Sequence, residues 1–225
     1  MTKMFLEKRE AVTVAVIGAM LFAGLLVYPS APETIPVHWN ASGQADGFGP
    51  KLLGLFAIPV FVLFLYAMFA AIPFLDPYKK NFQQFKNEYF CLKLGIILFF
   101  ACLYAGMLYY SLVGQFNFNY LMIPLLAGLF YLLGVLMPRF KRNFFVGIRT
   151  PWTLASETVW DKTHKVGGRL FKAAAFLSLA GLLFGDSAVW VAIASILVAS
   201  LVTVVYSFLK FRKEERRSQS SRRRK

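Results

Sequence analysis

Residues 53–75 read LGLFAIPVFVLFLYAMFAAIPFL and contain no charged side chain. A helix of about 20 apolar residues crosses the roughly 30 Å of hydrocarbon in a bilayer, so this stretch is long enough to span a membrane. Hydrophobic residues make up 58% of the 225-residue chain, a share too large for a soluble domain of this size. Similar apolar runs occur at 11–28, 94–113, 119–138, 170–185 and 188–210. The sequence therefore predicts an all-α polytopic membrane protein with six transmembrane helices.

The fifth run is the shortest. Its charge-free part reaches only from Ala173 to Gly185. To cross a bilayer, it must recruit residues 166–172, with Arg169 and Lys172 extending toward the headgroups. The sequence leaves two possibilities for residues 170–185, a full span or a re-entrant segment.

The distribution of basic residues predicts the topology. Six spans place 24 of the 25 lysines and arginines on one side of the membrane, and Lys51 is the exception. Excess Lys and Arg in short loops mark the cytoplasmic side, so both termini are predicted to be cytoplasmic. The net charge of +14 belongs to juxtamembrane clusters, in which each charge gains about 1 kcal/mol from anionic inner-leaflet lipid. Anionic lipids are therefore predicted partners, and direct binding of nucleic acid is not predicted.

The outer loop, residues 29–52, holds the candidate recognition residues Pro36, His38, Trp39, Asn40 and Asp46. In a structural interpretation, the tryptophan anchors the loop at the membrane interface and the asparagine and aspartate form Asx turns. In a functional interpretation, prolines and glycines hold these groups as a rigid surface facing the medium. A metal site is not predicted, because one histidine and two carboxylates lack ligand spacing.

The second candidate region is the cytoplasmic loop, residues 139–169. Thr150 followed by Pro151 predicts a helix N-cap, and Ser156 predicts a second one. From Val159 onward, apolar residues recur at spacings of three and four, which predicts a short helix lying on the membrane and running into the fifth span. A partner-binding surface and a purely structural elbow both fit this region. Its candidate residues are Asn143, Gly147, Arg149, Thr150, Trp152, Glu157, Trp160 and His164.

Two classes of function are disfavoured by the residue types present. The apolar cores of the six runs contain no Asp, Glu, Lys, Arg or His, whereas ion-coupled transport requires ionisable groups at membrane depth. A catalytic set could be assembled from Arg149, Glu157, Asp161 and His164. No nucleophile, metal-ligand or phosphate-loop motif accompanies these residues. No catalytic residue and no cofactor is predicted.

Two motifs carry a family resemblance. Residues 36–47 fit the pattern P-x-H-W-N-x-x-G-x-x-D-G and resemble the DUF1648 domain. Residues 147–154, GIRTPWTL, with the later Trp160, His164 and Gly167-Gly168, resemble the signature of the SdpI family. The resemblance divides the chain into a DUF1648-like part at 1–90, an SdpI-like part at 91–212 and a basic tail at 213–225.

This resemblance implies a protein of the bacterial cell membrane that confers immunity to a secreted antimicrobial peptide toxin. In the family's founding system such a protein also signals, by drawing a small helix-turn-helix autorepressor to the membrane. The toxin is then expected at the outer loop and the autorepressor at the inner loop. Two other classes compete with this interpretation: a transporter or lipid-handling membrane protein that is not ion-coupled, and an interfacial membrane enzyme.

Overall fold

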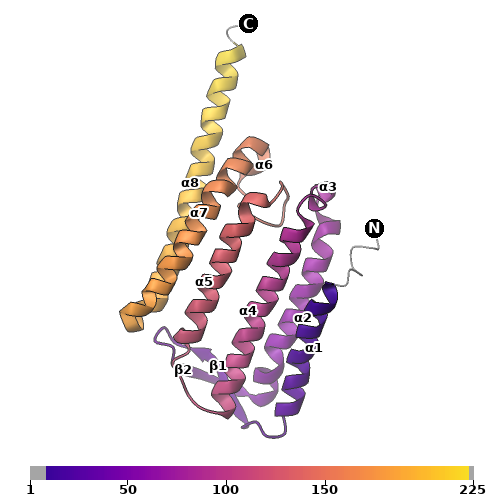
Figure 1. The fold of residues 1–225 in the computed structure, drawn as a ribbon, viewed down its shortest axis with the longest axis vertical. Helices are drawn as coiled ribbons and strands as arrows, with labels where there is room; N and C mark the ends of the chain where they lie inside the picture. Colours follow the sequence, from indigo (N-terminus) through magenta and orange to yellow (C-terminus); the bar gives the residue numbers. More distant parts are fainter. Residues whose placement is uncertain (1–8, 223–225) are drawn as a thin grey trace.

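The computed structural model describes residues 9–222, and expectations for the first eight and last three residues lie outside that range. Long helices dominate the fold (Figure 1). They are α1 (Glu10–Val27), α2 (Lys51–Leu75), α4 (Lys86–Leu112), α5 (Asn119–Leu136), α7 (Glu157–Gly181) and α8 (Ala188–Arg222). The short helices are α3 (Lys79–Phe82) and α6 (Pro151–Ala155), with 3-10 turns η2 (Met137–Arg139) and η3 (Leu182–Ser187).

The expectation of an all-α protein is wrong for the outer loop. Residues 34–50 form an antiparallel hairpin of β1 (Thr34–Trp39) and β2 (Ala45–Pro50). Thr34, Ile35 and Val37 are β-branched and favour extended backbone. Gly43, at φ 75°, supplies the positive φ that the connecting turn needs. The prolines and glycines that predicted an irregular loop therefore lie in and beside a two-stranded sheet.

Among residues 9–222, five helical stretches are long and apolar enough to cross a membrane. Four of them are α1, α2, α4 and the segment that α5 begins, and the fifth, Glu157–Ser220, contains α7 and α8 in succession. Gly185, at φ 56°, lies in η3, where the chain reverses direction between these two helices. Residues 166–172 are helical, as expected, within an unbroken α7.

The bundle has two ends (Figure 1). The hairpin and η3 lie at one end, named here the hairpin end, and α3 and α6 lie at the other, named the loop end. The described chain also begins and finishes toward the loop end, where α8 projects beyond its neighbours. Each end is therefore built from segments far apart in the sequence.

The helices pack as two groups that meet at α4 and α5. One group contains α1, α2 and α4, with a core around Leu55, Ile97 and Tyr104. In the other group, a Cβ on Gly134 would lie 2.8 Å from the carbonyl oxygen of Gly168. These glycines bring the backbones of α5 and α7 close together, as small residues do between membrane helices.

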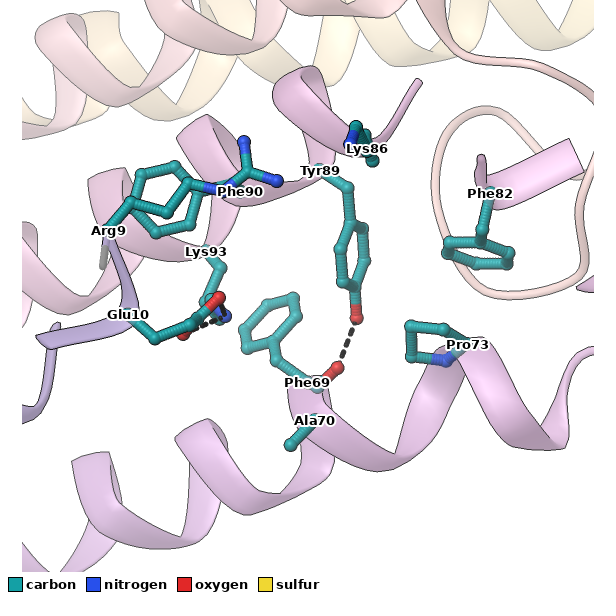
Figure 2. A pocket seen from close by; sticks show the side chains of 10 residues that line it. All are labelled: Arg9, Glu10, Phe69, Ala70, Pro73, Phe82, Lys86, Tyr89, Phe90 and Lys93. Carbon is teal, nitrogen blue, oxygen red and sulfur yellow. Dashed lines mark hydrogen bonds and ion pairs between the residues drawn. The ribbon is translucent and has the colours of Figure 1, made fainter. Parts of the chain in front are cut away.

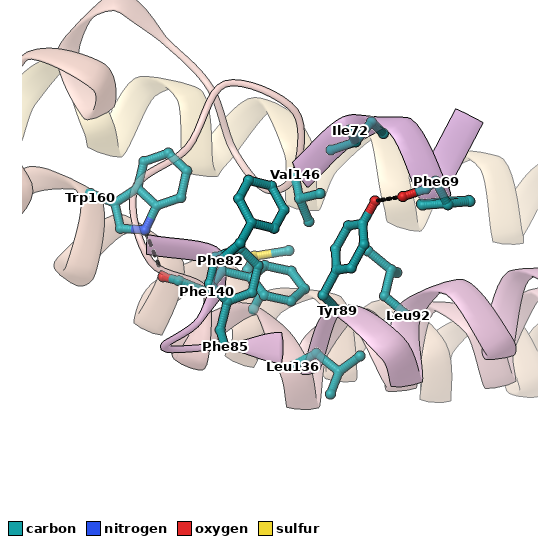
Figure 3. Close-up of a cluster of buried hydrophobic side chains, with 11 residues drawn as sticks. Phe69, Ile72, Phe82, Phe85, Tyr89, Leu92, Leu136, Phe140, Val146 and Trp160 are labelled. Carbon is teal, nitrogen blue, oxygen red and sulfur yellow. Dashed lines mark hydrogen bonds between the residues drawn. The ribbon is translucent and has the colours of Figure 1, made fainter. Parts of the chain in front are cut away.

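The expectation of a short helix lying on the membrane after Val159 is also wrong. That segment is the first part of α7, and its predicted apolar side is buried inside the protein, as Val159, Trp160 and Thr163 show. Aromatic side chains from α2, α3, α4 and the segment after η2 complete this core at the loop end (Figure 3). Periodicity identified the buried side of the helix correctly and its surroundings incorrectly.

Candidate functional site

At the hairpin end, Asn40 shapes the tip of the hairpin. Its side-chain Oδ1 accepts hydrogen bonds from the backbone N–H groups of Ser42 and Gln44, both at 3.0 Å. Its own backbone N–H donates to the carbonyl of Gln44 at 2.8 Å. The Asx turn expected at Asn40 is present.

The tip is fastened to the turn between α4 and α5. The backbone N–H of Phe118 donates to the Gly43 carbonyl at 2.9 Å, and the Asn119 side chain donates to the Ala41 carbonyl at 2.7 Å. The Trp39 ring stacks on Phe118 with centroids 4.2 Å apart. The Trp39 indole N–H is buried and has no acceptor within the described part of the chain. Trp39 thus packs against the protein and retains one unused donor.

His38 and Asp46 form a pair across the hairpin. Nδ1 of the histidine lies 2.6 Å from Oδ1 of the aspartate, and the two side chains are 70% and 44% exposed. Asp46 therefore faces His38 across the strands, where an Asx turn was expected. Val37 and Phe48 are exposed as well, whereas Pro36 is buried. The name hairpin surface is used below for the exposed residues Val37, His38, Asp46 and Phe48.

At the loop end, Asn143 holds the 139–169 loop together through hydrogen bonds made inside it. Its amide nitrogen donates to the carbonyls of Lys141 and Val146, at 2.8 and 3.0 Å. Its Oδ1 accepts the N–H groups of Phe145 and Val146, at 2.9 and 2.6 Å. The side chain is completely buried, so these bonds replace the water contacts that it loses.

His164 ties this loop to α7. Its Nε2 accepts the N–H of Ile148 at 3.0 Å, and its Nδ1 lies 2.8 Å from the Trp160 carbonyl. Nδ1 must therefore carry the proton, which makes the imidazole neutral. The ring is fully buried and stacks on Trp160 at 4.1 Å. Gly147, at φ 103°, passes so close that a Cβ would collide with Nε2. Both ring nitrogens are occupied, which leaves none for catalysis or a metal.

Both expected N-caps are present. The Thr150 side chain accepts the backbone N–H of Thr153, and the Thr153 side chain accepts the backbone N–H of Thr150. These two bonds form a capping box at the start of α6. Ser156 caps α7 by accepting the N–H of Val159 at 3.2 Å. Thr150 also contacts Ser207 of α8 at 3.1 Å, and Trp152 packs on Phe208 with ring centroids 5.0 Å apart. These contacts attach α6 to α8.

Asp76 is a site residue that the sequence analysis missed. Its carboxylate is fully buried at the end of α2. Oδ1 accepts the N–H of Tyr78 at 2.6 Å, and Oδ2 accepts the N–H of Phe144 at 2.7 Å. Asn81 adds a bond to the Arg142 carbonyl at 2.6 Å. The DUF1648-like part is thereby joined to the 139–169 loop, and the only signal in the sequence was an Asp-Pro pair after an apolar run.

A buried ion pair is a second missed feature. Lys93 lies within α4, and its Nζ is 2.6 Å from both carboxylate oxygens of Glu10 (Figure 2). The two side chains are 6% and 12% exposed. The Lys93 ammonium also lies over the rings of Tyr66 and Phe90, at 5.3 and 5.5 Å. The pair joins α1 to α4 and satisfies two charges that would otherwise be costly to bury.

Arg149, Glu157 and Asp161 are exposed. Arg149 donates through Nη1 to the Phe144 carbonyl at 2.6 Å, which closes the loop from outside. The structure does not assemble these residues with His164, because the imidazole is buried beneath the loop. Among residues 9–222, no group of three His, Cys, Asp or Glu side chains is placed to hold a metal ion.

Comparisons with known proteins agree with the two motifs. Residues 139–207 match the SdpI/YfhL protein family, and residues 15–63 match the domain of unknown function DUF1648. The chain is 25% identical over 208 residues to a Bacillus subtilis (strain 168) protein named immunity protein SdpI. The alignment covers 92% of this chain and 97% of that relative, and no solved structure matches. The chain therefore resembles SdpI/YfhL proteins, with a DUF1648-like segment ahead of the matched SdpI region.

Proposed function

We propose that this protein is a membrane immunity protein that protects the cell producing it from a secreted antimicrobial peptide toxin. The observation that carries the proposal is the nearly end-to-end alignment with a relative named as an immunity protein. Both matched segments contain a structured candidate site, the hairpin in one and the cytoplasmic loop in the other. The chain itself is a membrane protein with long apolar helices.

The proposed placement is multi-pass in the bacterial cell membrane, with six spans and both termini in the cytoplasm. Lysines and arginines concentrate in segments at the loop end, which is the pattern of a cytoplasmic face. The described chain begins and ends toward that same end (Figure 1). The hairpin then faces the medium, where a secreted peptide arrives.

The hairpin surface is the proposed contact for the toxin. Hydrogen bonds at the tip hold the strands rigidly, so little conformational entropy is lost when a peptide binds. Phe48 is 60% exposed beside the His38–Asp46 pair. An exposed aromatic ring beside polar groups is typical of binding hot spots.

We also propose that the cytoplasmic loop transmits the presence of toxin by binding a small helix-turn-helix autorepressor. The support is the set of exposed groups that the loop presents at the loop end. Phe144 and Phe145 are 41% and 36% exposed. Beside them, the Arg149 guanidinium has further donors for a carboxylate on a partner.

Survival of a toxin-sensitive strain that expresses the protein tests the proposal. Wild-type protein should restore growth in the presence of toxin, and Phe48→Ala should reduce that protection by about tenfold or more in tolerated toxin concentration. Phe184→Ala is the matched control, because Phe184 is 64% exposed at the same end of the bundle and lies in η3. Failure of the abundant wild-type protein to protect would refute the immunity function. Equal effects of the two variants would instead exclude the hairpin surface as the toxin contact.

A further inference from the structure

We propose that a basic cleft between α7 and α8 binds the phosphate headgroup of an anionic phospholipid. The cleft lies beyond the last apolar turn of α8. It is named here the α7–α8 cleft, and it is lined by Thr158, Lys162, Lys210, Lys213, Glu214 and Arg217. The proposal is independent of toxin binding and concerns how the loop end meets the membrane.

Four cations converge in the α7–α8 cleft. The Lys210 ammonium lies against that of Lys162 and close to the charges of Lys213 and Arg217. Like charges at such short range repel one another. An anion bound among them converts this repulsion into attraction. A phosphate group has the charge and the acceptor oxygens to do so.

The carboxylate in the cleft does not fill this role. Both oxygens of Glu214 accept the Ser156 hydroxyl, at 3.1 and 3.0 Å. That hydroxyl is the N-cap of α7, so Glu214 is held toward the start of the helix. One carboxylate, already hydrogen-bonded to Ser156, faces four cations. The cleft therefore keeps a net positive charge.

The position of the cleft, next to an apolar side of α8, favours a lipid over a soluble anion. Exposed apolar residues of α8 lead up to it, and Val205 and Leu209 are 47% and 59% exposed. Val205, Leu209 and Lys213 follow one another at four-residue intervals and so lie along one side of the helix. An acyl chain placed along the first two brings its phosphate to Lys213. Trp152, packed on Phe208 just before Lys210, marks the interfacial level.

Basic pockets between transmembrane helices on the cytoplasmic side bind anionic headgroups in this way. The lipid would bridge Lys162 of α7 and Lys210 of α8 and hold the two helices together where α8 leaves the bundle. The ligand class is therefore a phospholipid with a negatively charged headgroup, such as phosphatidylglycerol.

Native mass spectrometry of the purified full-length protein tests this site. The protein is titrated with phosphatidylglycerol and, separately, with phosphatidylcholine of the same acyl chains. Wild-type protein should prefer the anionic lipid. Lys162→Gln/Lys210→Gln should weaken that binding about 30-fold, because two membrane-facing charges are lost. Lys79→Gln/Lys80→Gln is the matched control, since it removes two exposed charges at the same end, on α3, and should leave the preference within about twofold.

Further arms separate the sources of an anion. Lys162→Arg/Lys210→Arg keeps the charges and should keep lipid binding, which excludes a loss caused by misfolding. If the glutamine double variant does not purify as a monodisperse protein, Lys162→Gln alone should still weaken binding about fivefold. Displacement of phosphatidylglycerol by millimolar inorganic phosphate or by an acidic peptide would overturn the lipid assignment. Equal binding of both lipids by wild type, or equal losses in the glutamine and control variants, would overturn the site itself.

Discussion

The hairpin and the 139–169 loop are both rich in motif residues, yet they use them differently. In the hairpin, His38 and Asp46 remain exposed while the backbone of the tip makes the attachment to the protein. In the loop, Asn143 and His164 are completely buried, and their side chains make the attachment. A polar motif in a membrane protein can therefore remain exposed at one end and form an internal scaffold at the other.

The buried scaffold of the loop predicts the largest effect. Trp160 is fully buried and its indole N–H donates to the Phe140 carbonyl at 2.8 Å (Figure 3). Trp160→Ala should lower the free energy of unfolding by about 3–5 kcal/mol, because it opens a cavity and leaves a buried carbonyl unpaired. Thermal unfolding of the purified protein in detergent measures this loss.

Trp190→Ala is the control for that comparison, since Trp190 is 60% exposed in α8. Its melting temperature should stay close to that of wild type. Equal destabilisation by the two substitutions would contradict the view that the loop end is held by its buried aromatic core.

The hairpin predicts a smaller and more local effect. Asn40→Ala removes the two hydrogen bonds that the Asn40 Oδ1 accepts from the backbone of the tip, a loss of about 1–3 kcal/mol in hairpin stability. Toxin protection should fall while the melting temperature of the helices stays unchanged. Survival assays scored beside membrane abundance check this. Full protection by Asn40→Ala at normal abundance would show that an ordered tip is not needed.

Arg149 predicts the smallest effect on stability, because its side chain is exposed and makes one hydrogen bond to the Phe144 carbonyl. Arg149→Lys should change stability by no more than about 1 kcal/mol. It should nevertheless impair recruitment of the cytoplasmic partner nearly as much as Arg149→Ala, since lysine lacks the planar fork of donors. Membrane recruitment of a fluorescently tagged repressor measures this. If Arg149→Lys recruits the repressor as well as wild type does, the arginine serves only to hold the loop together.

Local signals in the sequence predicted local structure well. Apolar runs identified the long helices, and Thr150 and Ser156 were recognised as N-caps, because each of these features depends on neighbouring residues. The spacing of three and four after Val159 likewise identified the buried side of α7. The hairpin was missed because its prolines and glycines are also typical of irregular loops.

Contacts between distant segments could not be predicted from one sequence. The bond between Asp76 and Phe144 joins residues 68 positions apart, and the Glu10–Lys93 pair joins residues 83 apart. Neither pair has a spacing that marks it in the chain. For the same reason, the sequence could not show that His164 is buried under Ile148 while His38 remains in contact with solvent.

Cysteine accessibility in intact cells tests most directly the claim that the hairpin and the loop face opposite sides of the membrane. Cys91 and Cys102 are free and exposed, so both are first replaced by serine. Single cysteines are then introduced as Ser42→Cys, Asp186→Cys and Ser218→Cys. A membrane-impermeant maleimide should label the first two in intact cells and the third only after permeabilisation. Labelling of Ser218→Cys in intact cells would contradict the six-span arrangement with cytoplasmic termini.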